Sequence, residues 1–109
     1  MLLLSSSRMV YSMKRNPNGE SLDALYRSIL TLKDEDECAA YFEDLCTIAE
    51  IKALAQRLEV AKMLKDGKTY TEVEAQTGAS SATISRVNRC LENGAGGYVT
   101  VLGRLEENV

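Results

Sequence analysis

The sequence predicts an all-α fold, and three observations support this. Hydrophobic residues make up 45% of the 109 residues but aromatic residues only 6%, with one proline and no tryptophan. Such a balance is typical of packed Leu, Ile, Ala and Val helices. Apolar residues recur at helical spacing in successive runs, and two of these runs open with the capping-box pattern T-x-x-E. A chain of this length is expected to form one small domain.

The first helix is expected to open at Ser21, after the turn-forming sequence NPNGE. Its apolar positions recur at helical spacing and cover a broad face, namely Leu22, Leu25, Tyr26, Ile29, Leu30 and Leu32. Residues 1 to 19, before the helical signals begin, are expected to be a poorly ordered arm. Within that arm, Met13 is an alternative first residue, with residues 1 to 12 an upstream extension.

A second helix is expected after Asp34, which resembles an N-cap residue with Glu37 as its partner three positions on. The apolar face of this helix comprises Cys38, Tyr41, Phe42 and Leu45. The acidic run DEDE suggests a metal site, but the preference of helix starts for negative charge explains it better. No metal site is therefore predicted there.

The longest helix is expected to open at Thr47, because TIAE at residues 47 to 50 is a capping box. Its predicted apolar stripe consists of Ile51, Leu54, Ala55, Leu58, Ala61 and Leu64. Lys65 and Asp66 mark the end of the helix, and Gly67 is the expected C′ residue.

Two shorter helices joined by a tight turn follow, at about residues 69 to 92. The first opens with the capping box TYTE and ends at Gly78; Ser80 can cap the second. Each has a narrow apolar edge, which is Val73 in the first helix and Ile84, Val87 and Leu91 in the second. Neither helix buries enough to stand alone, so both must pack on a larger helical support.

The sequence NGAGG is expected to stop the second short helix near Glu92. The segment YVTVLGRL that follows has the composition of a strand or of a short helix packing Val101, Leu102 and Leu105. A helix is predicted, because the chain offers no partner strand.

The apolar faces of the first two helices are broader than a domain of about 90 ordered residues needs to cover itself. Association of two chains is the simplest way to bury them. A two-fold dimer would also place two recognition helices one turn of DNA apart, roughly 34 Å.

Charge, cysteine content and the N-terminal residues limit the class of protein. The net charge is −3, but Glu20 to Cys46 carries −6 whereas Thr47 to Glu92 carries +1.

With three cysteines and no histidine, a four-ligand zinc site of the usual kind cannot be built. Cys38 and Cys46 on one helix would lie about 12 Å apart, too far for a disulfide. Reduced, mostly buried thiols are expected, as in a cytoplasmic protein. The apolar run MLLL is too short for a signal peptide or a membrane span.

Catalysis and nucleotide binding find little support. Without histidine, serine and cysteine nucleophiles lack their commonest base, and the acidic residues gather at one helix start instead of converging. The GAGG segment has neither the preceding strand nor the following helix of a phosphate-binding site. No enzyme activity and no cofactor are predicted.

The second short helix carries a surface suited to DNA. From Ser80 to Cys90 it contains two arginines, Arg86 and Arg89, and no acid, while Ser81 and Ser85 are short enough to let the backbone approach a groove. The alternative is a purely structural corner between helices. One departure weakens the DNA interpretation: Glu74 occupies a position where many helix-turn-helix units keep alanine, and it must point outward, where it would repel phosphate.

The chain resembles the Trp-repressor superfamily, most closely its YerC/YecD-like branch, over about residues 20 to 106. The resemblance rests on LTLKDEDECAAYFEDLCTIAEIKALAQRLEVAKMLKDGKTYTEV, TGASSATISRVNRCL and GGYVTVLGRL, in this order. It implies an intertwined, all-helical homodimer over residues 20 to 109, whose first three helices form a shared core with projecting helix-turn-helix units. It also implies a transcriptional regulator that binds an operator in double-stranded DNA. The family's DNA-facing positions fall on Thr71, Ser80, Ser81, Thr83 and Ser85, with Arg86 at the rim. Helix geometry adds Arg89.

The resemblance also raises the question of an effector pocket, which would involve Thr47, Arg57, Arg86, Val87 and Cys90. In the tryptophan-binding member of the family two arginines hold the indole, and Arg57 and Arg86 match them. That member has a glycine where Val87 stands and a serine where Cys90 stands. A branched side chain and a weakly accepting thiol both disfavour tryptophan. The sequence predicts another effector or none, and leaves open a protein-interaction module and a metabolite sensor as alternatives to DNA binding.

Overall fold

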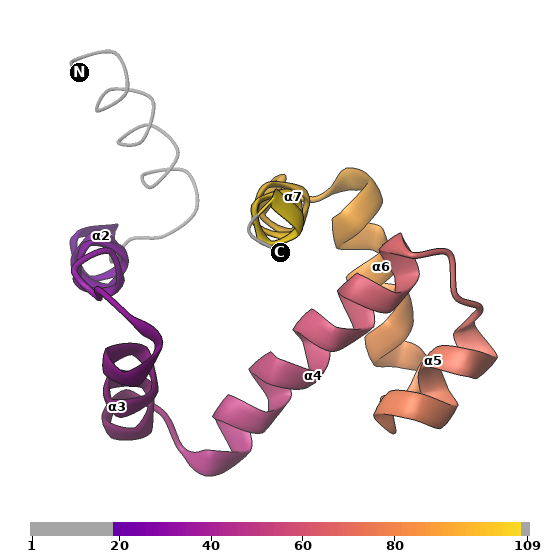
Figure 1. The fold of residues 1–109 in the computed structure, drawn as a ribbon, viewed down its shortest axis with the longest axis horizontal. Coiled ribbons are helices and arrows are strands. Elements are labelled where there is room, and N and C mark those ends of the chain that lie inside the picture. The colour runs from indigo at the N-terminus through magenta and orange to yellow at the C-terminus, as the bar shows by residue number, and fades with distance from the viewer. Residues whose placement is uncertain (1–18, 108–109) are drawn as a thin grey trace. The chain divides into compact units, whose positions relative to one another are not determined.

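The computed structural model describes residues 19 to 107, which form six helices joined by short turns (Figure 1). The described residues divide into two compact units, 19 to 45 and 46 to 107. The described residues contain no strand, so the predicted all-α fold is confirmed. The expected N-terminal arm lies outside the described residues except for Gly19.

Helix α2 spans Gly19–Ile29 and α3 spans Glu35–Leu45. Helix α2 thus begins two residues before Ser21, and the prediction that Leu30 and Leu32 belong to it is wrong. The N–H groups of Thr31 and Leu32 donate to carbonyls three residues back, at 3.2 and 3.1 Å. This tighter winding ends the α-helix before Leu32 is reached.

The start of α3 is fixed by two side-chain caps. The Asp34 carboxylate accepts the N–H of Glu37 at 2.8 Å, as predicted. The Glu37 carboxylate accepts the N–H of Lys33 at 2.9 Å, one residue before the cap. Hydroxyl groups of Ser28 and Tyr41 join the two helices by a hydrogen bond of 2.6 Å. No residue of α2 or α3 is buried in the single chain.

Helix α4 spans Ile48–Lys65, and its predicted caps are confirmed. Thr47 and Glu50 exchange hydrogen bonds of 3.1 and 2.8 Å, the reciprocal pattern of a capping box. At the other end, Gly67 adopts φ +86, its N–H donates to Leu64, and the N–H of Lys68 donates to Met63. These two bonds form a Schellman motif, which satisfies the last carbonyls of the helix.

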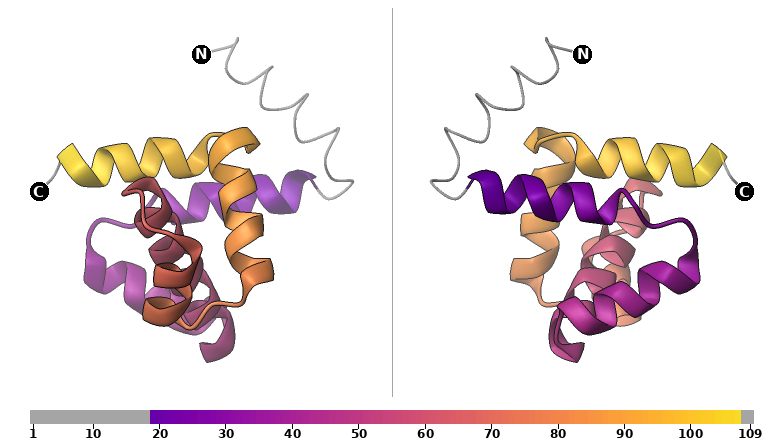
Figure 2. Two further views of the ribbon diagram at one scale, coloured as in Figure 1. Left: turned by 90° about the vertical axis from the view of Figure 1, so that its right-hand side faces the viewer. Right: turned by 90° about the vertical axis from the view of Figure 1, so that its left-hand side faces the viewer.

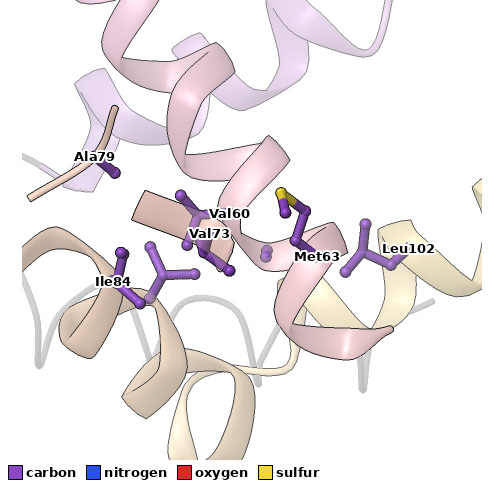
Figure 3. Packing of buried hydrophobic residues seen from close by; sticks show 8 residues of the cluster. Val60, Met63, Val73, Ala79, Ile84 and Leu102 are labelled. Atoms are coloured by element: carbon purple, nitrogen blue, oxygen red, sulfur yellow. The ribbon is translucent and has the colours of Figure 1, made fainter. Parts of the chain in front are cut away.

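The predicted apolar stripe of α4 is only partly correct. Its buried residues are Val60, Ala61 and Met63, of which the pattern contained only Ala61. Leu54, a predicted stripe residue, is 42% exposed. Within its unit, α4 is thus buried at its C-terminal half alone, where the later helices pack on it (Figure 3).

The remaining helices are α5 (Tyr70–Thr77), α6 (Ser81–Asn93) and α7 (Gly97–Glu107). All three contact α4, and α6 also contacts α5 and α7. Figure 2 shows the chain turning sharply at the end of α6, with α7 running away from it and crosswise to the direction of α6. The helix predicted for YVTVLGRL is confirmed, but Leu102 alone of its three predicted packing residues is buried.

One hydrophobic core holds α4 to α7 together. It consists of Val60, Ala61, Met63, Val73, Ala79, Ile84, Val87 and Leu102. Figure 3 shows the labelled side chains converging from all four helices and the turn before α6. None of the described helices is both long and apolar enough to cross a membrane. The three cysteines are free and half-buried, so they are less buried than expected.

Candidate nucleic-acid interface

The first helix of the pair, α5, is fixed at its start by the predicted capping box. Thr69 accepts the N–H of Glu72 at 3.2 Å, and the Glu72 carboxylate accepts the N–H of Thr69 at 3.3 Å. Val73 is fully buried against the core. The eight-residue helix therefore needs only one anchor, because both its start and its end are capped.

The turn between α5 and α6 depends on Gly78 and Thr77. Gly78 adopts φ +73, a left-handed conformation that strains other residues, and donates its N–H to Glu74 at 2.9 Å. The Thr77 hydroxyl donates to the carbonyl of Val73 at 2.7 Å and accepts the N–H of Ala79 at 3.1 Å. Gln56 on α4 donates to the Thr77 carbonyl at 3.2 Å. The turn is thereby tied to the long helix that supports it.

Helix α6 begins at a hydroxyl cap, as predicted. Ser80 accepts the N–H of Thr83 at 3.1 Å and donates its own hydrogen to the Thr83 hydroxyl at 3.1 Å. Ile84 is 0% exposed and Val87 is 1% exposed, and both face the core. Because buried residues occupy this side of α6, the opposite side faces outward.

The predicted DNA-facing residues differ in how far they are exposed. Thr71, Ser80, Ser81, Arg86 and Arg89 are exposed, whereas Thr83 and Ser85 are half-buried. Of this set, Ser81, Thr83, Ser85, Arg86 and Arg89 belong to α6, Ser80 caps that helix, and Thr71 belongs to α5. That these residues contact DNA stays a prediction, which a measurement of DNA binding would test.

Ala82 is an exposed residue of α6 that the sequence reasoning missed. It stands two residues before the buried Ile84, which places it on the opposite side of the helix. That spacing from a buried position was the available signal. An alanine methyl group carries neither charge nor a hydrogen-bonding group, so side-chain chemistry alone does not single it out.

The charges of the two helices differ in sign. Helix α5 has no basic residue and carries Glu72 and Glu74, and Glu74 is exposed as predicted. In α6, Arg86 and Arg89 are exposed, and the ion pairs found in the described part of the chain, Lys62 with Glu59 and Lys65 with Glu106, involve neither of them. Both guanidinium groups are therefore available to an external anion.

One of the candidate effector residues, Cys90, borders a hollow of the described structure. Cys90 lines an open, mostly apolar hollow of about 450 Å³ together with Leu58, Ala95, Gly97, Tyr98 and Val101. Thr47, Arg57 and Arg86 are not among its lining residues. Val87 is packed in the core. Thr47 is occupied as the cap of α4.

The turn after α6 is closed by a contact between Gly94 and Cys90. The N–H of Gly94 donates to the carbonyl of Cys90 at 2.9 Å. A Cβ atom at Gly94 would collide with the backbone of Cys90, so this position requires glycine.

Among the described residues, no group of Cys, Asp and Glu side chains is arranged to hold a metal ion.

Comparison with known proteins identifies the family. A model of the Trp repressor protein family matches residues 20–106. YerC of Bacillus subtilis (strain 168), described as an uncharacterized protein, is 58% identical over 89 residues, which span 82% of this chain and 86% of YerC.

Two solved structures agree with this match. A proposed Trp repressor from Staphylococcus aureus superposes with a TM-score of 0.77 at 50% identity, covering 80% of this chain and 87% of that one. A TrpR-like protein from Eubacterium eligens ATCC 27750 gives a TM-score of 0.77 at 53% identity, covering 80% and 90%. The resemblance found in the sequence is confirmed, and the chain belongs to the Trp repressor protein family.

Proposed function

We propose that this protein is a dimeric, cytoplasmic transcriptional regulator that binds an operator in double-stranded DNA and has no enzyme activity. The outward face of α6 carries the proposal. It presents two arginines that form no ion pair with another described residue, on a helix whose start, buried face and preceding turn are all fixed. Short side chains allow close approach to a groove, and guanidinium groups bind phosphates or guanine edges.

The apolar side chains left uncovered in the single chain support a dimer. Helices α2 and α3 bury no residue, and Leu30 and Leu45 are 78% and 48% exposed. In the second unit, Ile48 and Val99 are 71% and 56% exposed. A second copy of the chain would remove this surface from water, at about 25 cal/mol for each Å² buried. Family membership supports the same arrangement.

Selection from random duplex DNA tests the proposal. Full-length protein is incubated with the library, and the enriched duplex is then titrated at several salt concentrations. We expect one enriched sequence with two-fold symmetry and an affinity that falls steeply with salt, because phosphate contacts release counterions. Failure to enrich any sequence, together with equal affinity for unrelated duplexes, would contradict an operator-binding role.

Two other functions each have one supporting observation. Glu72 and Glu74 on α5 would suit a basic protein partner better than DNA. The hollow beside Cys90 would suit an apolar small molecule and hence a metabolite sensor. A protein-interaction module would bind no duplex in the same titration, and a sensor would change its DNA affinity with the small molecule present, so the titration separates these cases.

A further inference from the structure

The outward face of α6 has one exposed apolar side chain, that of Ala82. The helix contains four other apolar residues: Ile84 and Val87 are buried, and Cys90 and Leu91 are half-buried. A methyl group is therefore the apolar contact that α6 offers to anything lying against its outer side.

Helical spacing places this methyl group in line with the two arginines. At 3.6 residues per turn, Arg86 and Arg89 lie about one and two turns beyond Ala82 on the same side. All three residues are exposed. A ligand that engages the guanidinium groups along α6 thus also meets the Ala82 methyl group in the first turn.

The polar groups around Ala82 are partly committed to the helix start. The Ser80 hydroxyl both accepts the N–H of Thr83 and donates to the Thr83 hydroxyl. Thr83 and Ser85 are half-buried, which leaves Ser81 as the exposed hydroxyl of the first turn whose side chain no cap occupies. Apolar contact is consequently a large part of what this turn can offer a base edge.

We propose that Ala82 is a specificity-determining residue that reads the 5-methyl group of a thymine in the major groove. This inference rests on the proposed operator-binding function. Among the base edges of the major groove, thymine alone presents a methyl group, and alanine is a side chain suited to contact it. Burial of this methyl against Ala82 would favour thymine over other bases at one position of each half-site.

The test is a cycle of substitutions in protein and DNA. In the duplex selected from random DNA, each thymine of one half-site is replaced in turn by deoxyuridine, which removes only the 5-methyl group. Native protein and the Ala82→Gly variant are titrated against every duplex. Glycine also loosens the helix, but this cost is the same on both duplexes and cancels from the thymine-to-uracil affinity ratio.

We expect native protein to prefer thymine over uracil about four-fold at one position, the effect of burying one methyl group. Ala82→Gly should lower that ratio to about one. Ala49→Gly is the matched control, because Ala49 is likewise exposed and stands two residues after a hydroxyl N-cap, that of α4. This control should keep the four-fold ratio.

Two results would overturn the inference, and they differ from each other. If native protein binds the selected duplex tightly but Ala82→Gly leaves the ratio unchanged at every thymine, the role of Ala82 is wrong and the operator-binding function stands. If native protein selects no duplex at all, the proposed function fails and the role of Ala82 fails with it.

Discussion

Removing the α6 arginines should change how DNA affinity depends on salt. Arg86 and Arg89 are exposed and make no ion pair with another described residue, so Arg86→Ala and Arg89→Ala remove charge without disturbing the core. Unfolding free energies should therefore stay within about 0.5 kcal/mol of the native value. Denaturant titration of each variant checks this before any binding is measured.

The size of the effect follows from the number of phosphates contacted. A dimer presents each arginine twice, so a substitution that removes two phosphate contacts should reduce the log–log salt slope by about 1.8. Between 50 and 200 mM salt, native affinity should then fall about twelve-fold more than that of the variant. If Arg86 instead meets a guanine edge, the slope should persist while about 1 to 3 kcal/mol of base discrimination is lost.

Fluorescence anisotropy with a labelled operator duplex at five or six salt concentrations measures both quantities. Arg104→Ala is the matched control, because Arg104 is an exposed arginine that belongs to α7 and not to α6. Native slope and native affinity in both α6 variants would refute the reasoning and favour the protein-interaction module.

Three further predictions concern the dimer, the core and the effector. Leu25→Asp should cost several kcal/mol by placing a charge in the proposed dimer interface, and sedimentation would contradict the dimer if it showed a folded native monomer at micromolar concentration. Ile84→Ala should lower the unfolding free energy by about 2 to 5 kcal/mol, because Ile84 is 0% exposed; denaturant titration showing no loss would mean that α6 does not anchor the core. L-tryptophan should leave thermal melts unchanged, since Val87 and Cys90 replace the family's glycine and serine; saturation at ~100 times the dissociation constant would instead stabilise by about 2.7 kcal/mol.

The helix boundaries were largely predictable because they are decided locally. Capping boxes at Thr47 and Thr69, the cap at Ser80 and the glycine ends at Gly67 and Gly78 were all identified, since each involves partners within a few residues. The end of α2 was missed. There, i→i+3 bonds compete with the α-helical pattern, and spacing alone does not show which wins.

Burial along α4 was less predictable because it depends on neighbours distant in the sequence. Spacing marked Leu54 as a core residue, yet α5, α6 and α7 pack further along and bury Val60 and Met63 instead. A periodic stripe shows which side chains would avoid water, but it does not show whether the same chain or a second copy covers them. Leu54 is consistent with the second case.

The polar residues of the candidate site were chosen from the sequence by their chemistry, and their contact with DNA stays a prediction. Arginine and serine suggest DNA by their chemistry. Ala82 has no such group, although the apolar edge of Ile84 and Val87 already indicated that Ala82 lies on the opposite, outward side of α6. Val87, in contrast, was named as a candidate site residue but is buried. Assigned to an effector pocket by the family resemblance, it lies in the core, so a ligand near it would have to displace packed side chains.

The overall acidity of the chain bears on how such a regulator would discriminate among sequences. The net charge is −3, and α5 adds Glu72 and Glu74 beside the arginines of α6. Attraction to phosphate supplies essentially all non-specific DNA binding, so a protein with this charge should bind unrelated DNA weakly. Its affinity for an operator would then depend mainly on base contacts and fit, which the exposed face of α6 can supply. The same acidic side chains that weaken the total attraction would therefore widen the ratio between specific and non-specific binding. That ratio, multiplied by the frequency of competing sites, is the quantity that decides occupancy in a genome.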